Sequence, residues 1–170
     1  YNGAYLGPTL FLNAGDSVQF MVMNETDDTT TTHWHGLHVA PANDGGPHQH
    51  IMPGAAWSPS FTIRDKAGTY WYHPHMHGKT MDQVILGASG MIIVNDAEES
   101  ALELPRTYGV DDVPLVLQFK SIDIDGMLML DDEMDNEVLV NGDIMPQASL
   151  PAQVVRLRLL NGSSHRTFLI

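Results

Sequence analysis

The chain has 170 residues, 43% of them hydrophobic, which allows one domain of ordinary size or a small domain plus part of another. Asp and Glu total 21 against 8 Lys and Arg, and the formal net charge of -13 argues against nucleic-acid or anionic-membrane partners. The chain contains no cysteine, which excludes disulfides and thiolate chemistry within it. No apolar stretch approaches the roughly 18 residues of a membrane span, and the first residues carry no signal-peptide pattern.

The first hundred residues predict short strands separated by turns. Hydrophobic and polar residues alternate in several runs, and Gly, Pro, Asn or Asp flanks each run. A short helix is predicted near Thr80 to Leu86. Regularly spaced short strands are typical of an all-β sandwich or barrel. The predicted strands are residues 9–12, 17–24, 31–39, 58–63, 68–73 and 90–95.

The second half of the chain predicts a linker and then further strands. Between Asp96 and Val113 the alternation lapses, which is typical of an interdomain linker. The acidic run 131–135 predicts a solvated loop. We therefore expect a domain over residues 1–96 whose N-terminal edge is incomplete, a linker over 97–112 and a truncated second domain over 113–170. The strands predicted in that second domain are residues 113–119, 137–141 and 154–161.

The histidines are strongly clustered. Eight of the nine fall between residues 33 and 77. In an extended strand, a His-x-His pair places both imidazoles on one face, with their Cα atoms about 7 Å apart. That spacing suits two imidazoles that serve neighbouring metal ions, and imidazole favours copper, zinc, iron and nickel, with copper(II) bound most tightly. The sequence therefore indicates a metal site. Its two alternating pairs are His33-Trp34-His35 and His73-Pro74-His75.

Several motifs occur in an order that is specific to one family. They are Tyr1-Asn2-Gly3, Gly7-Pro8-Thr9, Gly15-Asp16, Thr32-His33-Trp34-His35-Gly36-Leu37, Gly45-Gly46-Pro47, residues 68–78 and Val140-Asn141-Gly142. Over nearly the whole chain they closely resemble the multicopper oxidases, and among these the three-domain bacterial copper-efflux oxidases and laccases. The resemblance implies cupredoxin-like Greek-key β domains, in agreement with the strand pattern.

The resemblance also implies a division of labour between copper ions. In this family a type 1 copper takes electrons from the substrate, and a trinuclear cluster reduces dioxygen to water. Carried over by position, His33 would bind the type 2 copper, and His35, His73 and His75 would bind the two type 3 coppers. This chain would then supply half of the histidines of the cluster. The type 1 ligands, including a cysteine, are expected in a C-terminal cupredoxin domain, so residues 1–170 alone are expected to be inactive.

The implied activity couples one-electron oxidation of phenolic or amine substrates, or of Cu(I), to four-electron reduction of dioxygen, in the periplasm or outside the cell. Asp44, in Asn43-Asp44-Gly45-Gly46, is by composition a turn residue. The resemblance implies a second role, because related enzymes keep an acidic residue there, close to the type 2 copper. A carboxylate at that place can relay the protons that dioxygen reduction consumes.

Two other classes of protein compete with this interpretation. Zinc and iron hydrolases also use His-x-His, but usually as His-x-His-x-Asp, whereas Leu37 stands at the acidic position here. A non-enzymatic copper-binding cupredoxin module, which buffers or delivers metal, is the main alternative. A His-Cys-His segment in the C-terminal part of the protein would discriminate the oxidase from that module.

Neighbours of the candidate ligands have expected roles of their own. By strand parity Trp34 should point away from the histidines and pack in the core. Because Pro74 cannot donate to a sheet ladder, His75 should lie at a strand end or bulge. His77 is expected to form a hydrogen bond beside the site rather than to bind metal. The histidines expected in nearby loops are His38, His48 and His50.

Overall fold

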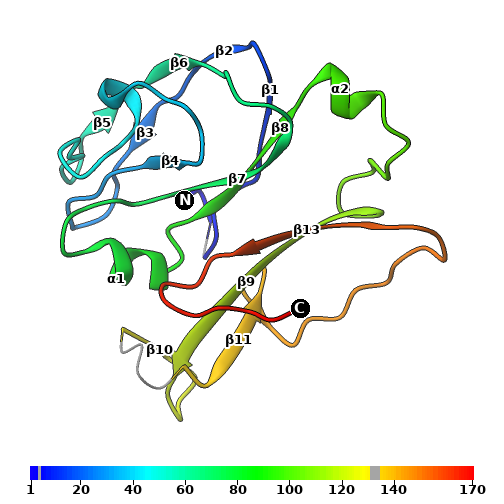
Figure 1. Cartoon of the computed structure of the whole chain (residues 1–170). Helices are drawn as coiled ribbons and strands as arrows, with labels where there is room; N and C mark the ends of the chain where they lie inside the picture. The colour runs from blue at the N-terminus through cyan, green and yellow to red at the C-terminus, as the bar shows by residue number, and fades with distance from the viewer. Residues whose placement is uncertain (4, 131–134) are drawn as a thin grey trace.

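The computed structural model describes residues 1–3, 5–130 and 135–170 (Figure 1). Most of the acidic run predicted to be a solvated loop, residues 131–134, therefore lies outside the described residues. Strands dominate, which confirms the all-β class. The helices of the described part are η1 (Pro41–Asn43), α1 (Thr80–Ile85) and α2 (Ala97–Ser100). None of them is long and apolar enough to cross a membrane.

The first part of the chain is built on a four-stranded sheet with the order β1-β8-β7-β4. Two short ribbons, β2 with β6 and β3 with β5, contribute side chains to a core on one face of this sheet. The centre of that core is formed by Trp34, Tyr72 and Ile92. The strands are β1 (Leu10–Asn13), β2 (Ser17–Gln19), β3 (Val22–Met23), β4 (His33–His35), β5 (Ala56–Trp57), β6 (Ser60–Thr62), β7 (Gly68–His73) and β8 (Gly90–Asn95).

The structure confirms the strands predicted at 68–73 and 90–95 and the helix α1, and it corrects two others. The strand predicted over 17–24 is divided into β2 and β3, because its two ends pair with different partners. The strand predicted over 31–39 is limited to β4. It ends where Gly36 adopts a φ of +90°, a left-handed conformation that turns the chain out of the sheet.

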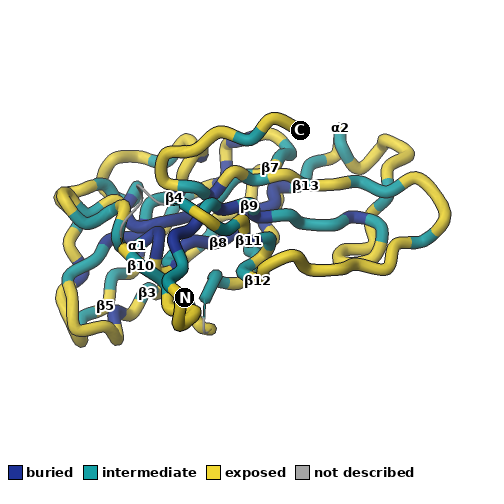
Figure 2. The backbone as a smooth tube through the Cα atoms, turned by 90° about the horizontal axis from the view of Figure 1, so that it is seen from below, coloured by how far each residue is buried: buried dark blue, intermediate teal, exposed yellow. Residues whose placement is uncertain are grey.

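The second part of the chain forms another sheet around the long strand β9 (Asp112–Ile122). Its order is β10-β9-β11-β12, and β13 pairs in parallel with the other half of β9. The other strands are β10 (Leu128–Met129), β11 (Glu137–Val140), β12 (Asp143–Ile144) and β13 (Arg156–Asn161). Buried residues gather along the central strands β7, β8 and β9, and the loops at the periphery are exposed (Figure 2).

The two sheets meet through a small apolar cluster with a charged contact at each end. Met91 and Ile93 of β8 pack against Val116 of β9 in the middle. At one end the carboxylate of Asp112 accepts hydrogen bonds from Arg158, and Arg158 also donates to Thr69 of β7 at 3.2 Å. Arg158, held by Asp112, thereby connects the second sheet to the first.

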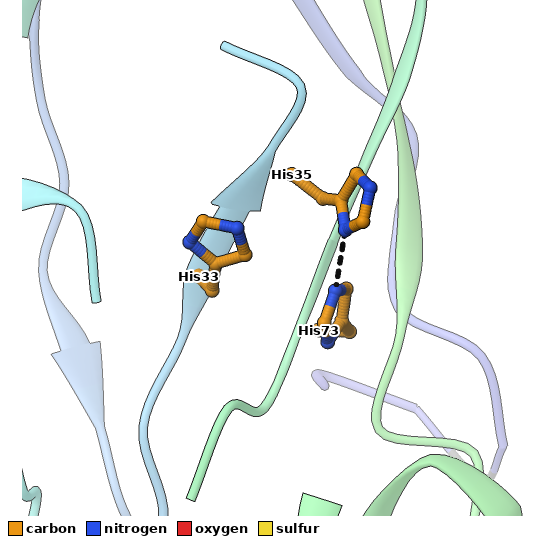
Figure 3. Close-up of side chains that lie close together, drawn as sticks. All are labelled: His33, His35 and His73. Carbon is orange, nitrogen blue, oxygen red and sulfur yellow. Dashed lines mark hydrogen bonds between the residues drawn. The ribbon is translucent and has the colours of Figure 1, made fainter. Parts of the chain in front are cut away.

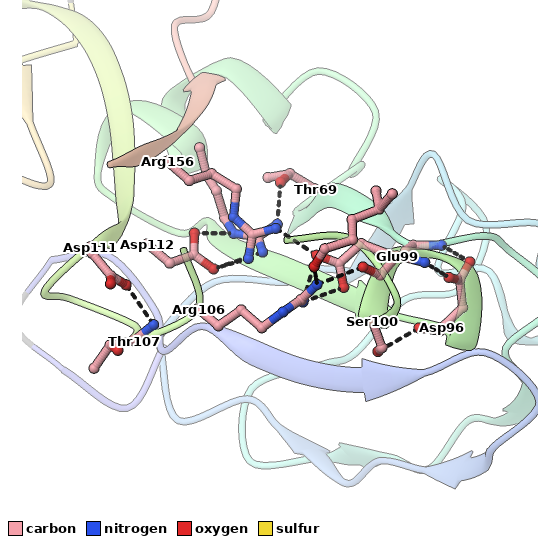
Figure 4. Close-up of polar contacts among 12 residues, drawn as sticks. Thr69, Asp96, Glu99, Ser100, Arg106, Thr107, Asp111, Asp112 and Arg156 are labelled. Carbon is pink, nitrogen blue, oxygen red and sulfur yellow. Dashed lines mark hydrogen bonds and ion pairs between the residues drawn. The ribbon is translucent and has the colours of Figure 1, made fainter. Parts of the chain in front are cut away.

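The same end of the interface includes a network of arginines and carboxylates (Figure 4). Arg156 donates to Glu99 of α2 at 2.6 Å and also pairs with Asp112. Burial alone would raise the pKa of Asp112, but the guanidinium groups of Arg158 and Arg156 lower it below its ordinary value. Arg106 donates to both carboxylate oxygens of Glu99. The segment predicted to be a linker is thus held to β13 by ion pairs.

At the other end lies the buried ammonium group of Lys120, whose residue is 1% exposed. Its Nζ donates to the carbonyl oxygens of Val84 at 3.2 Å and Ile85 at 3.0 Å. These carbonyls belong to the last turn of α1, where a cation compensates unpaired acceptors and the helix dipole. Burial lowers the pKa of Lys120 from 10.5 to about 8, with a small opposing effect of Asp135.

The lowered pKa of Lys120 predicts a pH-dependent stability. Unfolded, the side chain keeps its proton up to its ordinary pKa of 10.5, whereas the folded protein releases it near pH 8. Between these values the unfolded state binds more protons, so raising the pH favours folding by up to roughly 3 kcal/mol. We expect the free energy of unfolding of the parent, minus that of a Lys120→Met variant, to increase between pH 7 and 10. Urea unfolding of both proteins at several pH values measures this difference in unfolding free energy. A difference that does not change with pH would contradict the prediction.

Candidate metal centre

The pairing of β4 with β7 builds the site. These strands are antiparallel, with His33 opposite His73 and Trp34 opposite Tyr72. Because side chains alternate across a strand, Trp34 and Tyr72 point together into the core, where they are 2% and 4% exposed. His33, His35 and His73 therefore share the opposite face of the sheet. The packing role predicted for Trp34 is confirmed.

His75 joins the other three histidines from beyond the end of a strand. β7 ends at His73, and Pro74 follows, as predicted from its missing backbone donor. The backbone N–H of His75 instead donates to the hydroxyl of Thr31 at 2.6 Å. This contact turns the His75 ring toward His33, with the ring centroids 5.3 Å apart. The structure thus brings together all four histidines of the two motifs.

The ring nitrogens face one another closely enough to share a metal ion. His35 Nδ1 lies 3.0 Å from His73 Nε2 (Figure 3). One ligand nitrogen from each of His33, His35 and His73 lies within 4.8 Å of the others. In the part of the chain that the structure describes, this is the cluster suited to metal binding, and it contains only histidines. A set of neutral imidazoles without a carboxylate fits copper better than it fits calcium or magnesium.

Backbone carbonyls fix which nitrogen of two of the histidines can bind metal. His33 Nδ1 lies 2.9 Å from the carbonyl oxygen of Asp44, and His73 Nδ1 lies 2.7 Å from that of Pro74. A carbonyl oxygen only accepts hydrogen bonds, so each Nδ1 carries the proton and each Nε2 carries the lone pair that a metal ion can use; that of His73 faces His35 Nδ1. Hydrogen bonds of this kind orient metal-binding histidines in proteins.

Burial favours the uncharged form of two of the histidines, His73 and His35. It lowers the pKa of His73 to about 4, an effect that neighbouring histidines reinforce and the bond to the Pro74 carbonyl opposes. Burial also lowers the pKa of His35, with further contributions from His33 and His75. Since a metal ion requires the neutral imidazole, both rings are in the binding form at neutral pH. Trp71 packs against them, with its ring centroid 4.2 Å from that of His73 and 5.2 Å from that of His35.

A loop around η1 covers the outer edge of β4, the edge strand of its sheet. Asp44, at the end of this turn, places its Oδ1 3.2 Å from His33 Nδ1. That nitrogen has a single proton, which the nearer carbonyl oxygen of Asp44 accepts. Oδ1 is therefore buried without a hydrogen-bond partner among the described residues. The predicted turn residue thus also lies in contact with a candidate metal ligand.

The other histidines lie apart from this cluster. His77 is exposed and makes no hydrogen bond with any residue that the structure describes, so the partner expected for it is not found. His38 Nδ1 lies 2.5 Å from the carboxylate of Asp65, a contact that sequence reasoning missed because the two residues are far apart in the chain. His48 and His50 are exposed in the loop, as expected.

These features define an all-β protein with a candidate metal centre of paired histidines. The family model described as "Multicopper oxidase" matches residues 1–99. The multicopper oxidase mco of Staphylococcus haemolyticus is 40% identical over 172 residues, which cover 98% of this chain and 38% of that protein. The chain belongs to the multicopper oxidase family.

A solved structure and a further sequence relative extend this comparison. The laccase-like multi-copper oxidase CueO of Ochrobactrum sp. matches with a TM-score of 0.90 and 45% identity, over 97% of this chain and 39% of that one. The cell division protein FtsP of Escherichia coli is also similar, at 36% identity over 98% of this chain and 37% of its own length. The chain thus spans less than half the length of each of these three relatives.

The close packing of the covering loop on β4 predicts a special requirement for glycine at position 45. Gly45 has a φ of +72°, and a Cβ there would lie 1.7 Å from the carbonyl oxygen of Thr32. Gly54 has nearly the same φ, +74°, but a Cβ there meets no atom within 4 Å. We expect Gly54→Ala to cost about 1 kcal/mol of stability, the price of left-handed backbone alone, and Gly45→Ala to cost clearly more. Equal losses in urea unfolding would contradict this packing.

Proposed function

We propose that the protein containing this chain is an oxidase that couples one-electron oxidation of phenolic or amine substrates, or of Cu(I), to the reduction of dioxygen to water. The observation that carries this proposal is the set of four histidine rings gathered on one face of the β4–β7 edge. The proposal also rests on membership of the multicopper oxidase family. A periplasmic or extracellular location is part of the same proposal.

In this proposal His33 holds the type 2 copper, and His35, His73 and His75 hold the two type 3 coppers. Copper bound there supplies the redox chemistry of dioxygen reduction. The chain itself supplies neutral imidazoles, two of them oriented by the Asp44 and Pro74 carbonyls. Because His35 and His75 are exposed, further ligands can approach from another domain. We assign these ligands and the type 1 copper to the C-terminal cupredoxin domain of the same protein.

A second candidate is a non-enzymatic role, and the likeness to the cell division protein FtsP supports considering it. The two candidates differ in what copper does after binding. The oxidase consumes dioxygen when an electron donor is present, whereas a binding module retains copper without turnover. Copper analysis and dioxygen uptake of the full-length protein, with a phenol and with Cu(I) as donors, separate them.

The first ligand to test is His33. We expect His33→Ala in the full-length, copper-loaded protein to remove the type 2 signal from the electron paramagnetic resonance spectrum and to abolish dioxygen uptake, because the ion loses one of its few ligands. His48→Ala is the matched control, since His48 is an exposed histidine of the nearby loop. An unchanged type 2 signal in His33→Ala would refute the assignment.

Asp44 is proposed to relay protons to the site in addition to forming its turn. Reduction of one dioxygen to two waters takes up four electrons, which come from the substrate, and four protons, which a carboxylate in contact with a ligand can deliver. The buried, unpartnered Oδ1 beside His33 supports this role. An asparagine preserves the shape of Asp44 and its backbone carbonyl but cannot carry a proton.

We therefore expect Asp44→Asn to slow dioxygen reduction by roughly 10² to 10⁴-fold, the range for lost acid-base catalysis, while reduction of the type 1 copper by substrate keeps its rate. Stopped-flow reoxidation of the fully reduced protein measures the first rate, and anaerobic reduction measures the second. Asp16→Asn, at an exposed turn far from the site, is the control. If Asp44→Asn is reoxidised as fast as the parent, Asp44 is a turn residue only.

A further inference from the structure

The loop that carries Asp44 is closed by one side chain, that of Gln49. Its Oε1 accepts hydrogen bonds from the backbone N–H groups of Gly45 at 2.5 Å and Gly46 at 3.1 Å. Its amide Nε2 donates to the carbonyl oxygen of Ala42 on the opposite arm of the loop. A single amide group thus links both arms of the turn, before and after Asp44.

The loop held in this way accepts hydrogen bonds from side chains on both faces of the edge strand β4. Trp34, which points into the core, donates its Nε1–H to the carbonyl oxygen of Asn43 at 3.0 Å. His33, which points to the metal site, donates its Nδ1–H to the next carbonyl, that of Asp44, at 2.9 Å. Two consecutive carbonyls therefore receive side chains from opposite faces of β4. A shift of the loop would break both contacts.

We propose that Gln49 is a positioning residue for the metal centre, because it holds the Asp44 carbonyl where it fixes the proton of His33 on Nδ1 and directs Nε2 to the metal. This inference rests on the proposed function. Gln49 itself does not touch the metal-binding nitrogens. It acts through the backbone of Gly45 and Gly46, which follows Asp44 directly.

Glutamine suits this place because its amide accepts and donates at once. Leucine has a similar size but makes none of the three bonds, so the turn loses its closure. Glutamate keeps an acceptor for Gly45 and Gly46 but has no donor for Ala42. The two substitutions therefore separate the contacts beside Asp44 from the contact at the far arm.

The first experiment requires neither copper nor turnover. In the copper-free, full-length protein labelled with ¹⁵N in histidine, the Nδ1 proton of His33 is identified by its loss in His33→Ala. We expect Gln49→Leu to raise its exchange rate with water at least about tenfold, because the accepting carbonyl is no longer held. His50→Ala, which removes an exposed neighbour whose ring contacts the Pro47 carbonyl, should leave that rate unchanged.

The second experiment uses the copper-loaded protein. We expect Gln49→Leu to weaken retention of type 2 copper by roughly 10 to 100-fold, the usual effect of losing a group that orients a ligand, with the type 1 absorption unchanged. Gln49→Glu should lie closer to the parent than Gln49→Leu does. Competition with a chelator, followed by electron paramagnetic resonance, measures this retention.

The outcomes separate this inference from the proposed function. If the His33 proton and the type 2 copper respond as expected but the parent consumes no dioxygen, the proposed function fails and the positioning role stands. If the parent is an oxidase and Gln49→Leu matches it in proton exchange and copper retention, the positioning role fails. Equal losses in Gln49→Glu and Gln49→Leu would also overturn it, since the contacts beside Asp44 would then not be the ones that matter.

Discussion

The antiparallel pairing of β4 with β7 is the constraint on which the rest of the site depends. It sets His33 opposite His73 and, one residue along, Trp34 opposite Tyr72. A shift of one residue in this register would exchange the two faces, burying imidazoles and exposing the large aromatic side chains. The buried Trp34 and Tyr72 therefore hold the register, and with it the distance between the candidate ligands. In this way the hydrophobic core specifies the geometry of a polar site that it does not touch.

Hydrogen bonds from two of the imidazoles to the backbone then determine which ring nitrogen faces the metal site. Two ring protons are fixed by main-chain carbonyls, those of Asp44 and Pro74, rather than by side-chain carboxylates. Main-chain carbonyls do not titrate, so these two hydrogen bonds do not depend on the protonation state of their acceptors. Burial of His73 adds to this by disfavouring its charged form.

Much of this site could be predicted from the sequence, because strand alternation and the missing donor of Pro74 are local rules. The family resemblance supplied the copper assignment. The parts that escaped prediction depend on contacts between residues distant in the chain. Asp44 and its glycines indicated a turn, but nothing local showed that it packs on Thr32 or that Gln49 closes it. Likewise, Lys120 stands in a strand where burial of an ammonium is unexpected, and only α1, about 35 residues earlier, supplies its acceptors.

The position of Lys120 and Asp112 suggests how the two sheets keep one arrangement. The apolar cluster between them is small, and apolar contacts are not directional, so they would tolerate sliding of β9 along β8. The ammonium of Lys120 is bonded to the last turn of α1 at one end, and Arg158, which Asp112 holds in place, donates to Thr69 at the other end, so the offset is fixed at both ends. Sliding would leave the buried ammonium of Lys120 without its acceptors in α1, which costs far more than the loss of an apolar contact. Because α1 begins shortly after His75, the same anchors tie the second sheet to the segment that carries this candidate ligand.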